Sequence, residues 1–597
     1  MPLHAPAVAA SVPAARWRAV PTGVWLGAIV VLSAALRTAL AATVQVPTIF
    51  PDELVYWELA RSLGESGRFS IGGEPVAVWS YGPLYPLVIA PVHAFAGSLV
   101  DAYAATKALN ALLMSLAALP AYFLARRVLS ARGSLAVAAL SVLVPSAVYT
   151  TRIMAESLSY PVFLSAMLAI VAALERPSAG RQLLALTAIG VAALSRFQMI
   201  VLLPALASAI VLLAWAEARE HPESATRGRL TDFRVTWIVS GVLTAMVVVA
   251  GTVTSLGAHT AVAGDLNPLR APVKAVWHVA DLDLYSGVIP LAGFIIIAWS
   301  ALSSRGTNRQ LRAFAAIGTT AVTGLVVLAG LYSTAFPHVF DRYVFYAVPL
   351  FVIALVAWIE RRVPSPKPSF VACVLALLIV LPLTIPFDSL LNGREWGTST
   401  SAVGLVPWAW VGAFVGEGWA LNAVAVAFVG VLALAVWSVR SAPGWGLLRI
   451  TALLFVLSGV IVSVRNSALS SDFRPYAGGG EPTWIDDAAG RSRVAILYFG
   501  TNTGSGEQRL ALREARFFNR STGPVYDLEG PFAGGFPSTR ARLTQAGRLV
   551  TERGRPVRAQ YVLAWRSLGV IGSLVAADEG SGLGLYRTAG EVHLERQ

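Results

Sequence analysis

Charge and cysteine are both scarce in this chain of 597 residues. Only 13% of the residues are charged and 56% are hydrophobic, whereas soluble domains carry about 25% charged residues. This balance excludes an ordinary soluble protein and indicates one that crosses a membrane many times. The single cysteine, Cys373, excludes a disulfide framework.

Several motifs are also missing from the sequence. It has no internal repeats, no heptads, no Walker motif and no cluster of Cys and His with metal-ligand spacing. The lack of a nucleotide-binding loop argues against an ATP-driven transporter. No metal site is predicted. A divalent cation that bridges a carboxylate and a phosphate is the one cofactor left open, and no ligand cluster supports it.

Lysine is rare, so the formal charge of +13 comes from arginine. Much of this arginine lies in short loops between apolar segments. That is the positive-inside pattern of membrane proteins and not a surface for nucleic acid. The first apolar segment, 23–46, is too long for the core of a signal peptide, so we expect it to be retained.

We therefore predict a polytopic α-helical membrane protein with about thirteen transmembrane helices and a cytoplasmic N-terminal segment, 1–22. Because residues 84–96 are short and rich in proline, we predict a juxtamembrane helix there, within a first outer loop of 47–103. Further outer loops are expected near 151–156, 257–285, 335–342 and 388–414. The predicted spans lie at 23–46, 104–125, 134–150, 157–174, 182–196, 198–215, 235–256, 286–303, 313–334, 343–360, 369–387, 415–439 and 447–465.

The chain after the predicted transmembrane domain (23–465) differs in composition. Residues 466–597 are polar, with strand-like runs at 494–499, 561–565 and 583–586 and a helix-like stretch at 506–518. This pattern predicts a small extracytoplasmic α/β domain.

Polar residues gather at the predicted outer boundary. Asp52 and Glu53 follow the first span and open an amphipathic helix, and two carboxylates beside a membrane are costly unless they are used. Other loops bring polar or titratable groups to the same depth on the same side. These are Lys107, Arg152, Glu156, Arg196, Gln198, His338, Asp341, Arg342 and Tyr343.

These cations are suited to a substrate that carries phosphate, because the guanidinium group binds phosphate in a bidentate manner. A carboxylate beside them can take the proton of an incoming hydroxyl. Aromatic residues such as Tyr81 stack on a sugar ring or belong to the aromatic belt of the membrane interface.

Each residue also has a structural alternative, although Arg196 lies in a turn too short to form a solvated loop. The alternatives are snorkelling for Arg152, an interfacial anchor for Lys107, a local ion pair for Asp341 with Arg342, a structural role for His338 and a first-turn helix charge for Asp52 and Glu53.

Several segments resemble the GT-C membrane glycosyltransferases, in particular the branch of the lipid A aminoarabinose transferases and protein O-mannosyltransferases. The likeness covers residues 25–215 and 335–360. It lies in Asp52-Glu53-x-x-Tyr56-x-x-x-Ala60-Arg61, Gly82-Pro83-Leu84, 121–129, Tyr149 to Glu156, Ala193-Leu194-Ser195-Arg196, and Asp341-Arg342-Tyr343 with Pro349-Leu350.

The resemblance implies that the donor is a polyprenyl-phosphate sugar, used on the extracytoplasmic side with inversion at the anomeric carbon. It also implies that Asp52 is the catalytic base, that Glu156 is a supporting acid, and that Arg196 and Arg342 contact the donor phosphate. The aminoarabinose branch has a lysine where this chain has Ser80-Tyr81-Gly82, so one phosphate contact is missing or comes from elsewhere, with Lys107 as a candidate.

The sequence therefore predicts a multi-pass glycosyltransferase of the cell membrane that glycosylates a hydroxyl of an envelope glycan, lipid or protein. Glu53 is the alternative base. The predicted substrate-binding residues are Tyr81, Lys107, Arg152, Arg196, His338, Arg342 and Tyr343. The alternative functions are an oligosaccharide polymerase or ligase that uses polyprenyl-linked glycans, and a secondary transporter or lipid flippase. A transporter is expected to have charges near the bilayer midplane and paired repeats, and the sequence has neither pattern.

Overall fold

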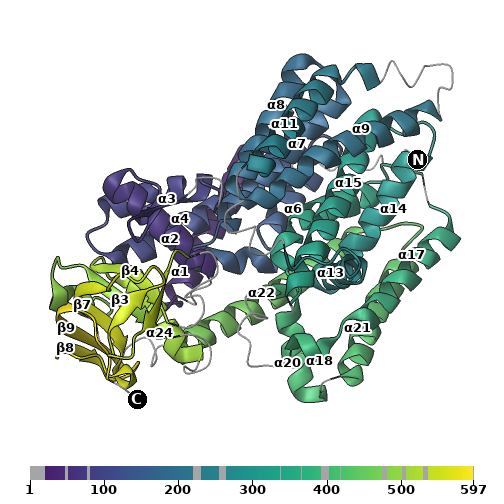
Figure 1. Cartoon of the computed structure of the whole chain (residues 1–597). Helices are drawn as coiled ribbons and strands as arrows, with labels where there is room; N and C mark the ends of the chain where they lie inside the picture. The colour runs from purple at the N-terminus through teal and green to yellow at the C-terminus, as the bar shows by residue number, and fades with distance from the viewer. Residues whose placement is uncertain are drawn as a thin grey trace, which may run out of the picture.

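The computed structural model describes residues 21–47, 51–76, 81–219, 230–253, 264–336, 338–364, 366–391, 402–416, 418–473, 481–499, 506–528 and 536–595. Helices dominate as far as Phe473, and a β-rich domain follows (Figure 1). The first helices are α1 (Thr22–Ala42), α2 (Pro51–Ser66), α3 (Leu84–Phe95), α4 (Leu99–Ser115), α5 (Ala118–Ala125), α6 (Ala131–Ser141), α7 (Glu156–Glu175), α8 (Ala179–Ser195) and α9 (Leu202–Ala218).

The later helices complete the helical part. They are α11 (Arg234–Val253), α13 (Ala271–Ser286), α14 (Ile289–Ser303), α15 (Arg309–Tyr332), α16 (Val348–Ile359), α17 (Pro368–Val380), α18 (Phe387–Leu391), α20 (Val406–Val415), α21 (Trp419–Ser438) and α22 (Trp445–Phe473). Short 3-10 turns connect them: η2 (Pro145–Thr151), η3 (Phe197–Val201), η4 (Ser333–Ala335), η5 (Asp341–Tyr343), η6 (Phe345–Ala347), η7 (Leu381–Thr384) and η8 (Val403–Leu405).

Many of these helices are apolar enough to cross a membrane. Among the described residues, seven helical segments have the length and hydropathy of a span, and up to nine do if each of two bent pairs counts as one. The predicted multi-pass helical architecture is confirmed, and every predicted span overlaps one or more helices within the described residues, although 254–256 of the span 235–256 lie outside them. The number of spans and the side on which each terminus lies remain predictions.

Two predicted outer loops contain helices that hydropathy did not indicate. Helix α13 lies in the expected loop 257–285, and α20 lies in the expected loop 388–414. Gly287 ends α13 with a φ of 76°, after which α14 leaves at a bend of 115°. This φ lies in the left-handed region and favours glycine, and a Cβ at Gly287 would also meet Leu454 Cδ1 at 2.6 Å.

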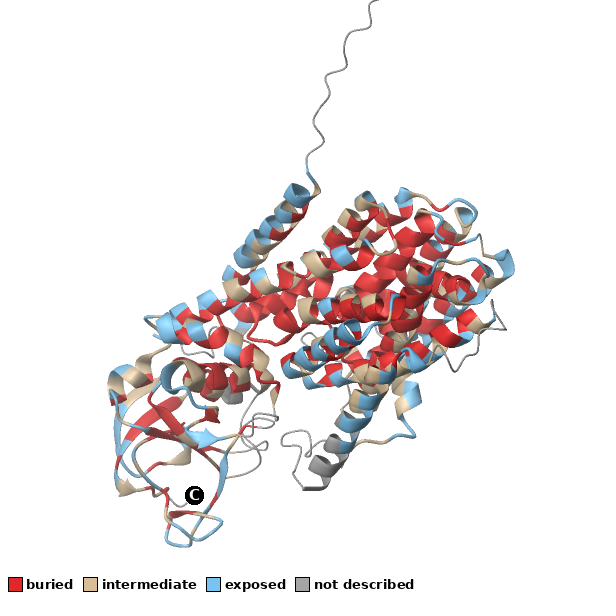
Figure 2. Ribbon diagram, turned by 90° about the horizontal axis from the view of Figure 1, so that it is seen from above, coloured by how far each residue is buried: buried red, intermediate tan, exposed pale blue. Residues whose placement is uncertain are grey.

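Serine residues begin several helices. The hydroxyls of Ser98, Ser130 and Ser178 accept hydrogen bonds from the amides three residues later, at the starts of α4, α6 and α8. Helix α16 is buried along its whole length, whereas α1 buries only Leu26, Val30 and Ala41. The buried residues gather inside the helical part (Figure 2), so α16 is central and α1 peripheral.

The C-terminal domain is built on a seven-stranded mixed sheet with the order β6-β5-β4-β3-β7-β9-β8. Its elements are α23 (Trp484–Ala489), β3 (Val494–Tyr498), α24 (Gly506–Phe518), β4 (Thr522–Asp527), β5 (Thr539–Leu543), β6 (Leu549–Thr551), β7 (Arg558–Trp565), β8 (Ser573–Asp578) and β9 (Leu583–Glu591). The predicted strand runs and helix coincide with β3, β7, β9 and α24. Helix α22 continues to Phe473, beyond the boundary predicted at residue 466.

The C-terminal domain packs against α2, the helix that follows the first span (Figure 1). The Trp57 ring stacks on Phe517 with centroids 4.3 Å apart, and its indole donates to the Phe517 carbonyl at 2.7 Å. The buried Glu58 carboxylate pairs with Arg516 at 3.1 Å and with Arg61 at 2.7 Å. Helix α2 therefore joins the membrane part to this domain.

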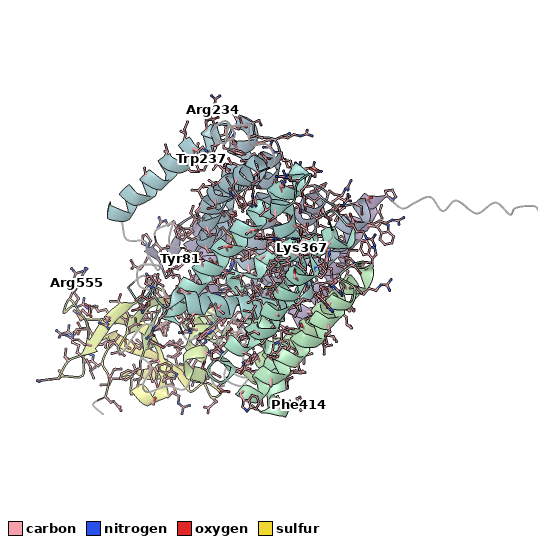
Figure 3. All side chains as sticks on the ribbon, turned by 90° about the vertical axis from the view of Figure 1, so that its right-hand side faces the viewer. Tyr81, Arg234, Trp237, Lys367, Phe414 and Arg555 are labelled. Carbon is pink, nitrogen blue, oxygen red and sulfur yellow. The ribbon has the colours of Figure 1, made fainter. Side chains whose placement is uncertain are left out.

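Three labelled side chains mark the outer limits of the helical part and of the C-terminal domain (Figure 3). Arg234, at the start of α11, and Phe414, in α20, lie at opposite ends of the helical part, and Arg555 lies at the outer margin of the C-terminal domain (Figure 3).

Candidate active site

The first turn of α2 carries the two acidic residues that the sequence predicted as catalytic, and their partners differ. The Asp52 carboxylate is 43% exposed and accepts from Arg342 Nη1 at 3.0 Å. Glu53 is fully buried and accepts from the backbone amide of Ile153 at 3.0 Å. Adjacent residues of a helix are separated by about 100°, so one acid faces the candidate site and the other faces the core.

A second ion pair lies beside the first. Glu156, the first residue of α7, is bound by Arg196, which ends α8, and Arg196 Nη1 also lies 3.5 Å from the Tyr346 hydroxyl. The Arg196 guanidinium lies 5.0 Å from the centroid of Tyr343, and that of Arg342 lies 5.7 Å from the same ring. Cations near an aromatic ring are stabilised by its quadrupole. Tyr343 thus lies within reach of both arginines.

Tyr56 belongs to the motif that begins with Asp52 and Glu53, but it was not among the residues predicted to bind substrate. It lies one turn after Asp52 in α2, on the same face. Burial raises the pKa of Tyr56, the charges of Asp52 and Glu156 raise it further, and Arg196 and Arg342 oppose the rise. The field of all four charged groups therefore reaches this one hydroxyl. Its i, i+4 spacing from Asp52, which places both residues on one face of a helix, is the sequence signal that could have assigned Tyr56 to this site.

Tyr81 is the predicted aromatic residue that lies in the field of Asp52. Burial and then the Asp52 charge raise the pKa of Tyr81 to about 12. It therefore remains protonated at neutral pH, and its hydroxyl can donate a hydrogen bond within the electrostatic field of Asp52.

Asp341 and Arg342 do not form the local pair that was one alternative. Arg342 turns to Asp52, whereas Asp341 accepts from the Tyr149 hydroxyl at 3.1 Å and from the Gly404 amide at 2.9 Å. These two bonds attach η5 to η2 and η8. Burial raises the pKa of Asp341 to about 7.

Two other predicted cations have structural contacts. Lys107 donates to the carbonyls of Ala41 and Val44 at 2.9 and 2.5 Å, at the end of α1. Arg152 donates to Asn466 Oδ1 at 2.7 Å and thereby connects the turn before α7 to α22. Both residues brace the backbone around the ion pairs.

His338 lies on the segment before η5. Its ring centroid is 6.3 Å from that of Phe340, which in turn packs edge to face on Tyr343 at 5.8 Å. His338 is therefore connected to the two arginines through aromatic packing.

No group of three His, Cys, Asp or Glu side chains within the described ranges has the arrangement of a metal site.

Comparisons with known proteins concern the family and the fold. Residues 80–250 match the family described as dolichyl-phosphate-mannose-protein mannosyltransferase. Among curated proteins, none matches the chain.

The structure is similar to that of ArnT from Cupriavidus metallidurans bound to undecaprenyl phosphate. The identity is 14%, the TM-score is 0.50, and the match covers 93% of this chain and 97% of ArnT. For ArnT in the apo state the identity is 14%, the TM-score 0.49, and the coverage 94% and 98%. The Archaeoglobus fulgidus oligosaccharyltransferase tethered with an acceptor peptide is more distant, at 13% identity, a TM-score of 0.39, and 84% and 64% coverage.

The match to ArnT confirms the predicted fold class, and the match of residues 80–250 agrees with the predicted resemblance. The chain therefore has an ArnT-like fold.

Proposed function

We propose that this protein is a glycosyltransferase that moves a sugar from a polyprenyl phosphate to an acceptor hydroxyl at the outer face of the cell membrane. The observation that carries the proposal is the pairing of two carboxylates with two arginines beside one aromatic ring, within an ArnT-like fold. The similar proteins support the donor class, because undecaprenyl phosphate and dolichyl phosphate are both polyprenyl phosphates.

Arg196 and Arg342 are proposed to hold the donor phosphate. Their guanidinium groups approach the same ring of Tyr343, and two planar forks suit the oxygens of one phosphate. Arg342 is nearly buried, with 6% of its side chain exposed. A low-dielectric setting strengthens its attraction for an anion.

Asp52 is proposed as the base in preference to Glu53. A base has to reach the hydroxyl that it deprotonates, and Asp52 is 43% exposed whereas Glu53 is enclosed and already bound to a backbone amide. Glu156 is proposed to orient Arg196. Tyr81, which lies in the field of Asp52, is proposed to contact the acceptor or the sugar.

Binding of the donor would free the base. Each of the two arginines is paired with a carboxylate. A phosphate that binds both guanidiniums replaces Asp52 as the anion beside Arg342, and Asp52 then becomes available to the acceptor. This exchange makes the base active only when the leaving group is in place.

The proposed transfer is one displacement. The acceptor hydroxyl loses its proton to Asp52 as its oxygen forms a bond to the anomeric carbon, and the bond from that carbon to the phosphate oxygen breaks. Polyprenyl phosphate leaves with the bonding electrons, and its added charge is stabilised by Arg196 and Arg342. Attack opposite the leaving group inverts the anomeric configuration.

The remaining predicted residues are proposed to hold neighbouring parts of the protein in place around the site. Lys107 and Arg152 hold α1 and α22 around the site, and His338 supports Phe340 and Tyr343 at its edge.

Sugar transfer by the purified full chain in proteoliposomes, with a panel of polyprenyl-phosphate sugars, tests the proposal. Removing a general base lowers the rate by about 10²–10⁴-fold, and we expect this loss for Asp52→Asn. We expect Glu53→Gln to stay within roughly tenfold of wild type, since the glutamine oxygen still accepts from Ile153. Thermal unfolding serves as the folding control. Full activity in Asp52→Asn would refute the assigned base, and no transfer from any polyprenyl-phosphate sugar would refute the donor class.

A further inference from the structure

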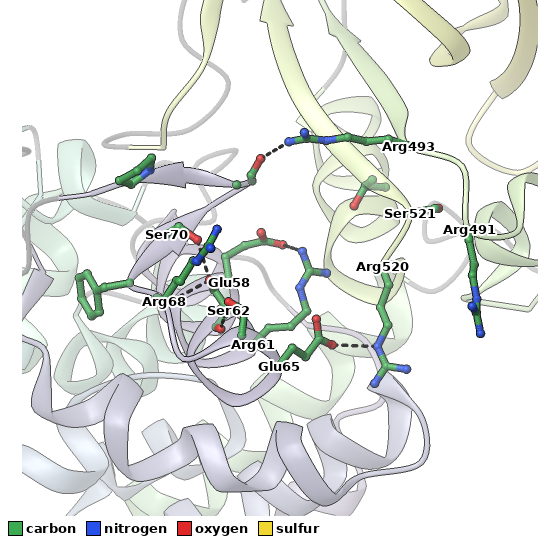
Figure 4. A pocket seen from close by; sticks show the side chains of 16 residues that line it. Glu58, Arg61, Ser62, Glu65, Arg68, Ser70, Arg491, Arg493, Arg520 and Ser521 are labelled. Atoms are coloured by element: carbon green, nitrogen blue, oxygen red, sulfur yellow. Dashed lines mark hydrogen bonds and ion pairs between the residues drawn. The ribbon is translucent and has the colours of Figure 1, made fainter.

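A cavity of about 610 Å³ lies away from the two ion pairs, between the later turns of α2, the hairpin of β1 (Ser70–Ile71) and β2 (Glu74–Pro75), and the C-terminal domain (Figure 4). None of Asp52, Glu156, Arg196 and Arg342 lines it. Its volume is in the range of small-molecule sites, about 300–1,000 Å³. The cavity is therefore large enough for an organic ligand.

The walls of this cavity carry an excess of positive charge. Five arginines and two glutamates line it. Glu58 is committed to Arg61 and Arg516, and Glu65 pairs with Arg520 at 3.0 Å. Both carboxylates are thus paired with arginine, so the excess positive charge comes from the other arginines.

The surplus arginines come from both sides of the cavity. Arg493 reaches from the C-terminal domain to the hairpin and donates to the Gly72 carbonyl at 2.6 Å (Figure 4). Arg68, beside the hairpin, and Arg491, in the C-terminal domain, make no ion pair or side-chain hydrogen bond with the residues that the structure describes. Both the hairpin side and the C-terminal domain therefore contribute to this cavity arginines without a carboxylate partner in the described ranges.

The backbone of the hairpin lies close to the side chain of Arg493. Gly73 has a φ of 86°, and a Cβ there would meet Arg493 Nη2 at 2.9 Å. A larger residue would push this guanidinium from its position. The positive φ of Gly73 favours glycine at this turn, which lies close to the Arg493 guanidinium.

We propose that this interdomain cavity binds a ligand that carries a phosphate group, separate from the site at Asp52. Arginines contributed by both sides of the cavity match a phosphate better than a neutral sugar, because a phosphate offers several anionic oxygens to forked donors. The volume leaves room for the group to which the phosphate is attached. Free inorganic phosphate and the head group of an anionic lipid share this chemistry.

Binding to the purified full chain at low ionic strength tests the proposal, because salt screens such contacts. The probes are inorganic phosphate, dihexanoyl phosphatidic acid and, as the neutral comparison, dihexanoyl phosphatidylcholine. We expect a phosphate probe to bind to wild type and the double variant Arg68→Gln/Arg491→Gln to weaken binding by roughly tenfold or more. The matched control is Arg555→Gln, an exposed arginine of the same domain outside the cavity.

Each outcome decides the proposal. Binding of inorganic phosphate alone supports a free phosphate ligand, and binding of phosphatidic acid alone supports a lipid head group. Equal binding of phosphatidylcholine, an equal loss in Arg555→Gln, or no binding of either phosphate probe to wild type would overturn the proposal. The result is independent of the transfer experiment, because neither variant changes the ion pairs at Asp52 or Glu156.

Discussion

Replacing Glu58 by glutamine is expected to loosen the contact between α2 and the C-terminal domain. Glu58 is 2% exposed, and its carboxylate is shared by Arg516 and Arg61. Burial opposes its ionisation, but Arg516 and Arg61 together hold the pKa of Glu58 below its ordinary value, so it is charged at neutral pH. The neutral amide leaves two guanidiniums without their counter-charge, and Arg516 is fully buried.

The size of this effect follows from the burial of the pair. Removing one partner of a buried ion pair costs about 3–5 kcal/mol. The glutamine oxygen still accepts one hydrogen bond, so we expect the lower end of this range. A cost of about 3 kcal/mol increases the population of undocked molecules by roughly 10²-fold, since 1.4 kcal/mol corresponds to a factor of ten.

Hydrogen exchange measured by mass spectrometry reports this opening directly. In Glu58→Gln, amides of α2 and α24 that exchange only on undocking should exchange roughly 10²-fold faster. The control is Glu65→Gln on the same helix, which removes a pair whose side chains are 40% and 44% exposed, and exposed pairs contribute about 0–1 kcal/mol. Exchange in Glu58→Gln no faster than in Glu65→Gln would show that the buried pair does not hold the domain.

Three further changes have defined outcomes. Because Tyr343 lies near both arginines, Tyr343→Ala should weaken donor binding by about three- to thirty-fold, measured as KM, whereas Tyr343→Phe should not. Lys107→Met should lower the unfolding temperature with KM unchanged, because Lys107 bonds the end of α1; a large rise in KM with unchanged stability would instead indicate substrate binding. Burial lowers the pKa of His93 to about 3. As the pH falls, the unfolded chain therefore binds this proton at a higher pH than the folded protein does. The stability that neutral His93 contributes is full above pH 6.5 and is lost as the pH falls toward 3. The unfolding temperature of the wild type should therefore fall between pH 7.5 and pH 5, and that of His93→Gln should fall less. An equal fall in both proteins would show that His93 does not cause it.

The apolar segments and the order of the elements could be predicted from the sequence. A backbone in lipid has to satisfy its own hydrogen bonds, so a long apolar run becomes a helix wherever it packs. Helix α13 was missed because Lys274, His278, Asp281 and Asp283 interrupt its apolar pattern. Its burial comes from neighbouring helices, which a hydropathy average does not include.

For the candidate site, the sequence by itself determined the residue types and their approximate depth, because charged groups collect where the apolar segments end. Only the tertiary structure decided their partners. Asp52 and Glu53 are adjacent in sequence, yet one meets Arg342 and the other the amide of Ile153. The arginine-lined cavity is likewise lined by both Arg68 and Arg491, which are more than four hundred residues apart in the sequence. Such contacts depend on how α2 is rotated and on where the C-terminal domain docks, and packing across the whole chain sets both.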